Sequence, residues 1–502
     1  MSQPAKNVAA QTAAKKQNNL MTTYIHCAIG IGFMLLFPML PPIEPMTEIG
    51  MVVLATFIGM IYLWSTVNST WPSLLGLMLI ALSGYAGPGY GGMKSVIMNS
   101  FGMDTVIIAL FSMVLFGAVE YVGCSAYIAR WFLTRPIING RPYVFILVFL
   151  LCCYVLSALT SPITSLFILW AIAVDILAIL NISKTDKFYP IFIVGTFFAA
   201  TIGQPMLPFK GAQLIVVSAY EQMSGQVVNH LSYITFNFIM SMLLMAVFLL
   251  FIKFVFRPDI SNLKNINIDQ FNANPLPPMN QRQKLFLWMI VVYISMLLAP
   301  SFLPATVPGI QLLKDLGVLG VTIICVVVMC IIHVDDGRPA LQFREVAAKQ
   351  LSWDVFFLIA AAVYAANAVS NDITGIKEWM IQVLNPILGG RPEFIFAVLL
   401  FLVALILTNF ANNAAMAVVL MPIIIAFCDQ GGMPSMPFAM GVAMMVFVAM
   451  LTPSASPHAG MMHGRKDLVS TGDIMRIGFP LVLAALVVYV IIGFPIAKIL
   501  FA

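Results

Sequence analysis

Long runs of apolar residues alternate with short polar connections along most of the 502-residue chain. A helix needs about 20 apolar residues to cross a membrane, so each run predicts a spanning helix. We predict an all-α polytopic membrane protein with about 11 transmembrane helices. The runs are approximately Tyr24–Leu40, Gly50–Val67, Val144–Leu159, Thr164–Leu180, Ile234–Val255, Leu285–Leu298, Leu316–Ile332, Phe394–Leu407, Ala414–Phe427, Phe438–Leu451 and Phe479–Ile499.

Shorter or interrupted apolar segments lie between these runs. Short hydrophobic segments broken by Gly or Pro are the best sequence indication of a transporter's binding region. They are Leu74–Leu82, Thr105–Val122, Asp354–Ser370 and the proline-containing stretch Ile202–Val217.

The composition excludes several classes of protein. Hydrophobic residues make up 61% of the chain and charged residues only 9%, whereas a soluble protein has about 25% charged residues. Soluble enzymes, nucleic-acid binders and disordered scaffolds are therefore excluded. The glycines of Gly87–Gly92 fit G-x-G-x-x-G but lack a βαβ context. The seven cysteines show no metal-binding spacing, and the sequence contains no P-loop, His-Glu-x-x-His or Gly-x-Ser-x-Gly motif. We therefore expect no enzyme activity and no resident cofactor, with Na⁺ only as a coupling ion.

Basic residues indicate the orientation in the membrane. They mark the polar N-terminal tail, one loop in the first half, the long central connection and the last loop. By the positive-inside rule these segments are cytoplasmic. We therefore expect a protein of the plasma (inner) membrane with its N-terminus in the cytoplasm and its C-terminus outside. The predicted organisation is a cytoplasmic tail at 1–22, a first half at 23–256, a cytoplasmic linker at 257–284 and a second half at 285–502.

Three landmarks recur in the same order in both halves. Asp104 and Asp354 each open an apolar run, and Thr160-Ser161-Pro162 aligns with Ala411-Asn412-Asn413. Pro208 and Gly211 align with Pro457 and Gly460. The offsets agree within two residues, which predicts two repeats. If each repeat has an odd number of spans, they are inverted, as in many secondary transporters.

Polar residues interrupt a span at equivalent places in the two repeats. Ser157–Pro162 and Thr408–Asn413 both place hydroxyl or amide groups within apolar runs. Broken helices expose carbonyls to cations and N–H groups to anions. Such residues also join helices by hydrogen bonds, but their repetition favours a binding site.

Ionisable side chains within apolar segments are a second indication of function. Lys210 lies in the first Pro- and Gly-rich break, where it binds an anion or extends to the membrane surface. Glu120 and Asp175 are either ion relays or partners in helix packing.

Several motifs resemble those of the divalent-anion/sodium symporters of the ion-transporter superfamily, along nearly the whole chain. Pro41-Pro42, Trp64 and Trp71-Pro72 are similar to the opening of that family, and Ser352-Trp353-Asp354 with Thr374-Gly375 resembles its second hairpin. Asn412-Asn413-Ala414 stands where a Ser-Asn-Thr triplet is expected, and Pro162-Ile163 replaces Asn-Thr in the first triplet.

The resemblance implies a homodimeric elevator-type transporter with two helical hairpins and two inverted repeats, which carries dicarboxylates, usually with Na⁺. The anion contacts that it implies, together with Lys210, are Pro162, Ile163, Asn412, Asn413 and Ala414. The sodium ligands that it implies are Ser157, Ser161, Pro162 and Gly203 at one site, and Thr408, Ala411, Asn413 and Ser454 at the other.

We therefore expect a secondary active transporter of small organic anions, di- or tricarboxylates, coupled to Na⁺ or H⁺. The expected partners are the small anion, membrane lipid and a second copy of the chain. Lys210 is expected to replace one of two sodium ions. Alternatives are an antiporter of the same superfamily for a cation or an inorganic oxyanion, and a membrane scaffold or sensor without transport.

Overall fold

The computed structural model describes residues 3–266 and 276–501, which fold into helices joined by turns without a β-strand in these ranges. The chain separates into two compact units. Unit 1 comprises Met1–Met103 and Trp353–Ile387, and unit 2 comprises Asp104–Ser352 and Leu388–Ala502. An all-helical architecture is the one expected for an apolar chain, because a helix satisfies its own backbone hydrogen bonds in lipid.

Unit 1 is built around three helices that pack on one another, α2, α3 and α16. The indole of Trp64 donates to the hydroxyl of Ser73 at 3.0 Å, and Thr70 donates to the carboxylate of Asp354 at 2.6 Å. The helices of this unit are α1 (Gln3–Leu36), α2 (Glu48–Thr66), α3 (Thr70–Leu82), α4 (Gly89–Phe101), α16 (Trp353–Ser370) and α17 (Ile376–Leu388).

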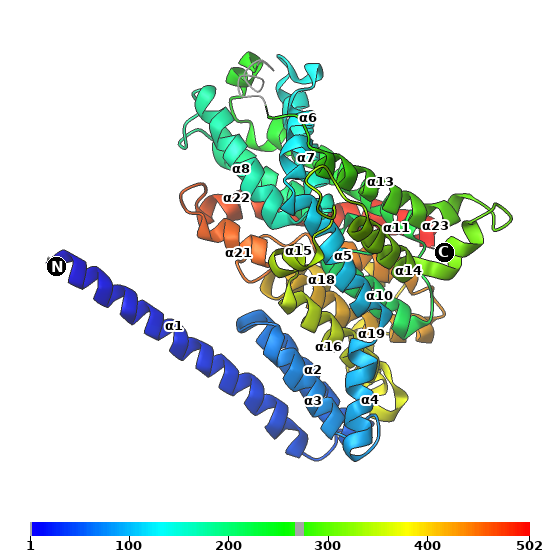
Figure 1. Cartoon of the computed structure of the whole chain (residues 1–502). Helices are drawn as coiled ribbons and strands as arrows, with labels where there is room; N and C mark the ends of the chain where they lie inside the picture. The colour runs from blue at the N-terminus through cyan, green and yellow to red at the C-terminus, as the bar shows by residue number, and fades with distance from the viewer. Residues whose placement is uncertain (1–2, 267–275, 502) are drawn as a thin grey trace. The chain divides into compact units, whose positions relative to one another are not determined.

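Unit 2 contains the remaining helices (Figure 1). Those before the central connection are α5 (Asp104–Tyr121), α6 (Cys124–Leu133), α7 (Pro142–Leu159), α8 (Pro162–Ile179), α9 (Phe188–Gly203), α10 (Gly211–Ser224) and α11 (His230–Leu250). Those after it are α13 (Gln281–Phe302), α14 (Ile310–Ile331), α15 (Phe343–Gln350), α18 (Glu393–Phe410), α19 (Asn413–Gly431), α20 (Met436–Met445), α21 (Pro457–Gly464), α22 (Thr471–Val488) and α23 (Phe494–Phe501).

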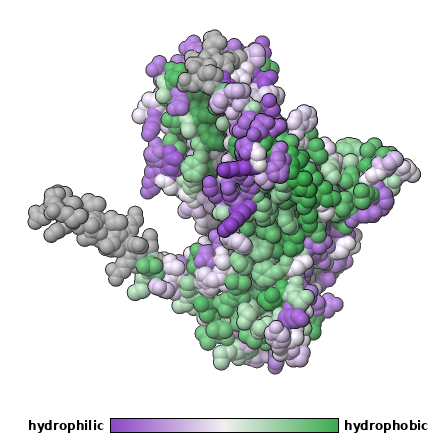
Figure 2. All heavy atoms as spheres, in the orientation of Figure 1, coloured by the Kyte–Doolittle hydropathy of each residue, from purple (hydrophilic) through white to green (hydrophobic). Residues whose placement is uncertain are grey.

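Thirteen helices of the described residues are long and apolar enough to cross a membrane. The viewed face has broad hydrophobic areas, with hydrophilic residues gathered around the loops near α6 and α8 (Figure 2). Ten of the eleven predicted runs coincide with these helices. Asp104–Tyr121 and Trp353–Ser370, expected to be short segments, are uninterrupted 18-residue helices.

Two predictions about the spans were wrong. The helix Phe188–Met206 was missed because it is the least apolar candidate, and 89% of its span window is buried within the protein rather than exposed to lipid. Conversely, Phe438–Leu451 is not a continuous helix, since α20 ends at Met445. Side chains of α18 bind the backbone beyond that point, as described below, and replace helical hydrogen bonds.

The central connection lies within unit 2. Its residues 267–275, which include Pro275 of the predicted linker, lie outside the described residues. Asn280 caps α13 and exchanges hydrogen bonds with Gln283, at 2.8 and 3.1 Å, which is a capping box. The division into a tail, two repeat-containing halves and a linker stays a prediction.

Candidate functional site

The first interruption separates α7 from α8 in unit 2. Helix α7 ends at Leu159, and Thr160 departs from helical geometry with φ −119° and ψ −108°. Ser161 then caps α8, because its hydroxyl accepts from the N–H of Thr164 at 3.1 Å. Pro162 occupies the first turn of α8, where a missing N–H costs nothing, and Ile163 is half-exposed. The predicted break is therefore confirmed.

Ser157 and Gly203 join α7 to α9. The hydroxyl of Ser157 donates to the carbonyl oxygen of Ala200 at 2.6 Å. A Cβ atom on Gly203 would lie 2.5 Å from the carbonyl oxygen of Tyr154, so only glycine fits this contact. In this structure, both predicted site residues serve the close approach of the two helices.

The ammonium group of Lys210 lies at the carboxyl end of α7. Its Nζ donates to the carbonyl oxygen of Ala158 at 2.8 Å and also to that of Thr160. The same nitrogen lies 4.9 Å from the centre of the Phe116 ring, and Glu120 adds an electrostatic interaction. Two backbone carbonyls and an aromatic face thus contact the Lys210 ammonium, and each of them attracts a cation.

The second interruption separates α18 from α19. Helix α18 ends at Phe410, and Ala411 is extended with φ −143° and ψ 169°. The side-chain oxygen of Asn412 accepts from the N–H groups of Ala414 and Ala415 at 3.1 and 3.3 Å. Asn412 therefore caps α19, and this break is also confirmed.

Thr408 and Asn413 meet across the second interruption. The hydroxyl of Thr408 donates to the side-chain oxygen of Asn413 at 2.8 Å and to the carbonyl oxygen of Val446. Both side chains are buried. The carbonyl oxygen of Ala411 accepts no hydrogen bond from the described residues. Hydroxyl, amide and carbonyl oxygens are the ligands of hard cations.

Asn409 holds the extended segment that follows α20. Its Oδ1 accepts from the N–H groups of Met450 and Leu451 at 3.2 and 3.0 Å. The hydroxyl of Thr452 donates to the Asn409 carbonyl oxygen, and Ser454 bonds to that hydroxyl at 2.9 Å. The sequence analysis assigned no site role to Asn409 or Thr452, although an asparagine within an apolar run is a signal.

The structure brings the predicted residues together in two sets. Ser157, Gly203 and Lys210 lie around the end of α7, and Thr408, Asn412 and Asn413 around the start of α19. No hydrogen bond between described residues joins the two sets directly. Their surroundings do interlock, because α10 packs against α19 and α21 packs against α8.

Asp175 lies away from both sets. It lines an open pocket of about 300 Å³ together with Lys184, Arg465 and Asp467. Lys184 donates to the backbone carbonyl of Asp467 at 2.6 Å. The guanidinium of Arg465 donates to the Asp467 carboxylate at 2.8 Å and lowers its pKa, so this network joins two loops.

Comparison with known proteins gives the family. Residues 61–443, more than half of the chain, match the family model described as citrate transporter. An uncharacterized transporter of Haemophilus influenzae is 21% identical over 90% of this chain and 92% of its own length. The uncharacterized transporter YfbS of Escherichia coli is 31% identical, but over only 30% of this chain and 25% of its own.

A solved structure shows the same fold. The YdaH transporter of Alcanivorax borkumensis, described as having an unusual topology, aligns with a TM-score of 0.53. The alignment covers 82% of this chain and 88% of that chain, at 15% sequence identity. Its helical fold and the family match agree with the resemblance found in the sequence. The chain is thus a membrane protein of the citrate transporter family within the ion-transporter superfamily.

Proposed function

We propose that the protein is a secondary active transporter of small di- or tricarboxylates, in which Lys210 supplies one cation and an exchangeable Na⁺ or H⁺ supplies another. The observation that carries the proposal is the ammonium of Lys210, bound to the carbonyls of Ala158 and Thr160 at a broken span. An ionisable group at such a place is costly and typical of a transport pathway.

The capped starts of α8 and α19 support anion binding. Each follows an interruption, and a helix N-terminus carries a partial positive charge. The caps Ser161 and Asn412 already accept from the N–H groups of Thr164, Ala414 and Ala415, so the proposal relies on that charge rather than on those three donors. Asn412 and Asn413 add amide groups to the second start. Pro162 and Ile163 add no side-chain donor to the first, so in the proposal its positive charge comes from Lys210.

The oxygens around Asn413 support an exchangeable cation at the second interruption. The hydroxyl of Thr408, the amide oxygen of Asn413 and the carbonyl of Ala411 come from one short stretch of chain. No fixed cation is bound to them among the described residues.

The proposal also includes an elevator motion, two inverted repeats and a homodimer in the plasma membrane. The reciprocal packing of α10 on α19 and α21 on α8 supports the repeats.

Uptake into proteoliposomes tests the proposal. Labelled citrate and succinate should accumulate saturably under a Na⁺ or a proton gradient. The Asn413→Ala variant should raise the half-saturating concentrations of both anion and coupling ion about tenfold, because a lost hydrogen bond costs about 1.4 kcal/mol. Asn99→Ala, at an exposed position, is the matched control. The proposal is wrong if neither carboxylate is transported under any gradient.

A further inference from the structure

Glu120 lies on the helix face that meets Lys210. Phe116, whose ring lies 4.9 Å from Lys210 Nζ, precedes it by one helical turn on α5, and residues four apart share a face. The carboxylate and the ammonium interact electrostatically. The Glu120 carboxylate makes no hydrogen bond and no direct ion pair, with Lys210 or any other residue, within residues 3–266 and 276–501.

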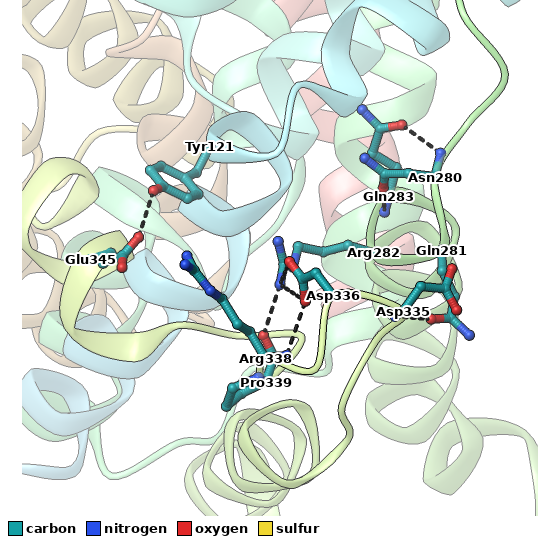
Figure 3. Close-up of polar contacts among 10 residues, drawn as sticks. All are labelled: Tyr121, Asn280, Gln281, Arg282, Gln283, Asp335, Asp336, Arg338, Pro339 and Glu345. Carbon is teal, nitrogen blue, oxygen red and sulfur yellow. Dashed lines mark hydrogen bonds and ion pairs between the residues drawn. The ribbon is translucent and has the colours of Figure 1, made fainter.

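Helix α15 fixes the end of α5 that carries Glu120. A Cβ atom on Gly117 would lie 2.5 Å from the Cβ of Gln350, so the two helices touch closely. The hydroxyl of Tyr121 donates to Glu345 at 3.0 Å (Figure 3). Lys349 lies 4.9 Å from the centre of the Tyr121 ring. These contacts leave the last turn of α5 little freedom.

Two other charged residues near this end of α5, Arg282 and Glu345, have polar partners. Arg282 pairs with Asp336 at 3.0 Å in the same view (Figure 3). Glu345 is bound by Tyr121. Glu120 is the carboxylate that shares a face of α5 with Phe116 and acts electrostatically on Lys210, so it can balance that charge when no anionic substrate is present.

We propose that Glu120 is the internal counter-ion that neutralises Lys210 in the empty transporter, and that a substrate carboxylate displaces it. The inference rests on the proposed function. A carrier that returns empty must move its site through a low-dielectric barrier, where an unpaired charge is costly. The Glu120–Lys210 pair therefore permits the empty return that net transport requires, whereas exchange returns the site loaded with anion.

The test compares net uptake with exchange in the Glu120→Gln variant. Net uptake is measured into liposomes without internal substrate, and exchange as counterflow against unlabelled citrate. We expect net uptake to fall at least tenfold while counterflow stays within about twofold of wild type. Glu120→Asp, which keeps the charge, should restore part of the net uptake. Glu378→Gln, at an exposed position in the first turn of α17, is the matched control and should leave the ratio of the two rates unchanged.

Each result decides the question. An unchanged ratio in Glu120→Gln overturns the inference, and so does an equal loss of both activities in Glu120→Gln and Glu120→Asp, which would assign the residue to stability or substrate binding. Wild-type protein that shows neither uptake nor counterflow contradicts the proposed function instead, so the two failures are distinguishable.

Discussion

The two interruptions share a backbone plan but differ in what binds their carbonyls. Ser157 and Thr408, 251 residues apart, each donate a hydroxyl hydrogen bond to a carbonyl of a later segment. At the next position, the carbonyl of Ala158 binds the ammonium of Lys210, whereas that of Asn409 binds the hydroxyl of Thr452. One carbonyl therefore faces a fixed charge and its counterpart a neutral donor.

The difference continues two residues later. Lys210 also binds the carbonyl of Thr160, while the equivalent carbonyl of Ala411 accepts nothing from the described residues. A covalently attached ammonium cannot be released, so it contributes charge without adding to the ions transported. Under the proposed function, the first interruption therefore has a cation of its own, and the second takes one from solution.

Among the substitutions that test the difference between the two interruptions, removal of Lys210 should have the largest effect on uptake. In Lys210→Ala two carbonyls lose a charged donor worth about 3 kcal/mol, so uptake without sodium should fall on the order of 100-fold. The remaining uptake should rise with sodium concentration, because the vacated carbonyl of Thr160 then resembles that of Ala411, which accepts no hydrogen bond from the described residues. Uptake rates measured over a range of sodium concentrations give both quantities.

Two controls complete this experiment. Lys187→Ala removes an exposed lysine near the start of α9 and should change neither rate nor ion dependence. Lys210→Arg keeps a charge and should retain part of the uptake. Wild-type rate and ion dependence in Lys210→Ala would mean that the lysine only caps the end of α7.

Substitution of Asn409 should have the next largest effect, on the stability of the protein. Its Oδ1 satisfies two N–H groups of the extended segment after α20, and Ala158, its counterpart, has no such group to offer. Asn409→Ala should lower the free energy of unfolding by about 2 kcal/mol, because buried unpaired donors are costly. Thermal unfolding in detergent and faster amide exchange in residues 446–456 would show it. Unchanged exchange there, with Asn99→Ala as reference, would refute the role.

The sequence predicted the helical class, ten of the spans and both interruptions, because hydropathy and helix-breaking residues act locally. It could not predict Phe188–Met206, since a helix buried among other helices tolerates polar residues. Nor could it show that Phe438–Leu451 ends early, because Thr408 and Asn409 bind that backbone from about 40 positions away.

The same limit applies to individual site residues. The carbonyl partners of Lys210 lie about 50 residues before it, and the sequence contains no signal for that pairing. Helices α10 and α21 begin at Gly211 and Pro457. Lys210 and Ser456 each precede one of these helices, but only Ser456 caps its helix through the side chain. The sequence alignment instead paired Pro208 with Pro457.

The equivalent hydroxyls give the smallest effect and the most direct comparison. Thr408→Val keeps the side-chain shape but removes the donor to Asn413 and Val446, and Ser157→Ala removes the donor to Ala200. Each should cost about 1 kcal/mol of stability, seen as similar small decreases in melting temperature.

Only Thr408→Val should also raise the half-saturating concentration of the coupling ion, about fivefold. The Thr408 hydroxyl orders the oxygens that, in the proposed function, bind that ion. Ser157 lies beside Lys210, whose ammonium is present at any ion concentration, so its removal should leave ion dependence unchanged. An equal shift of ion dependence in both variants would mean that both interruptions bind an exchangeable cation, and the asymmetry assigned to Lys210 would be wrong.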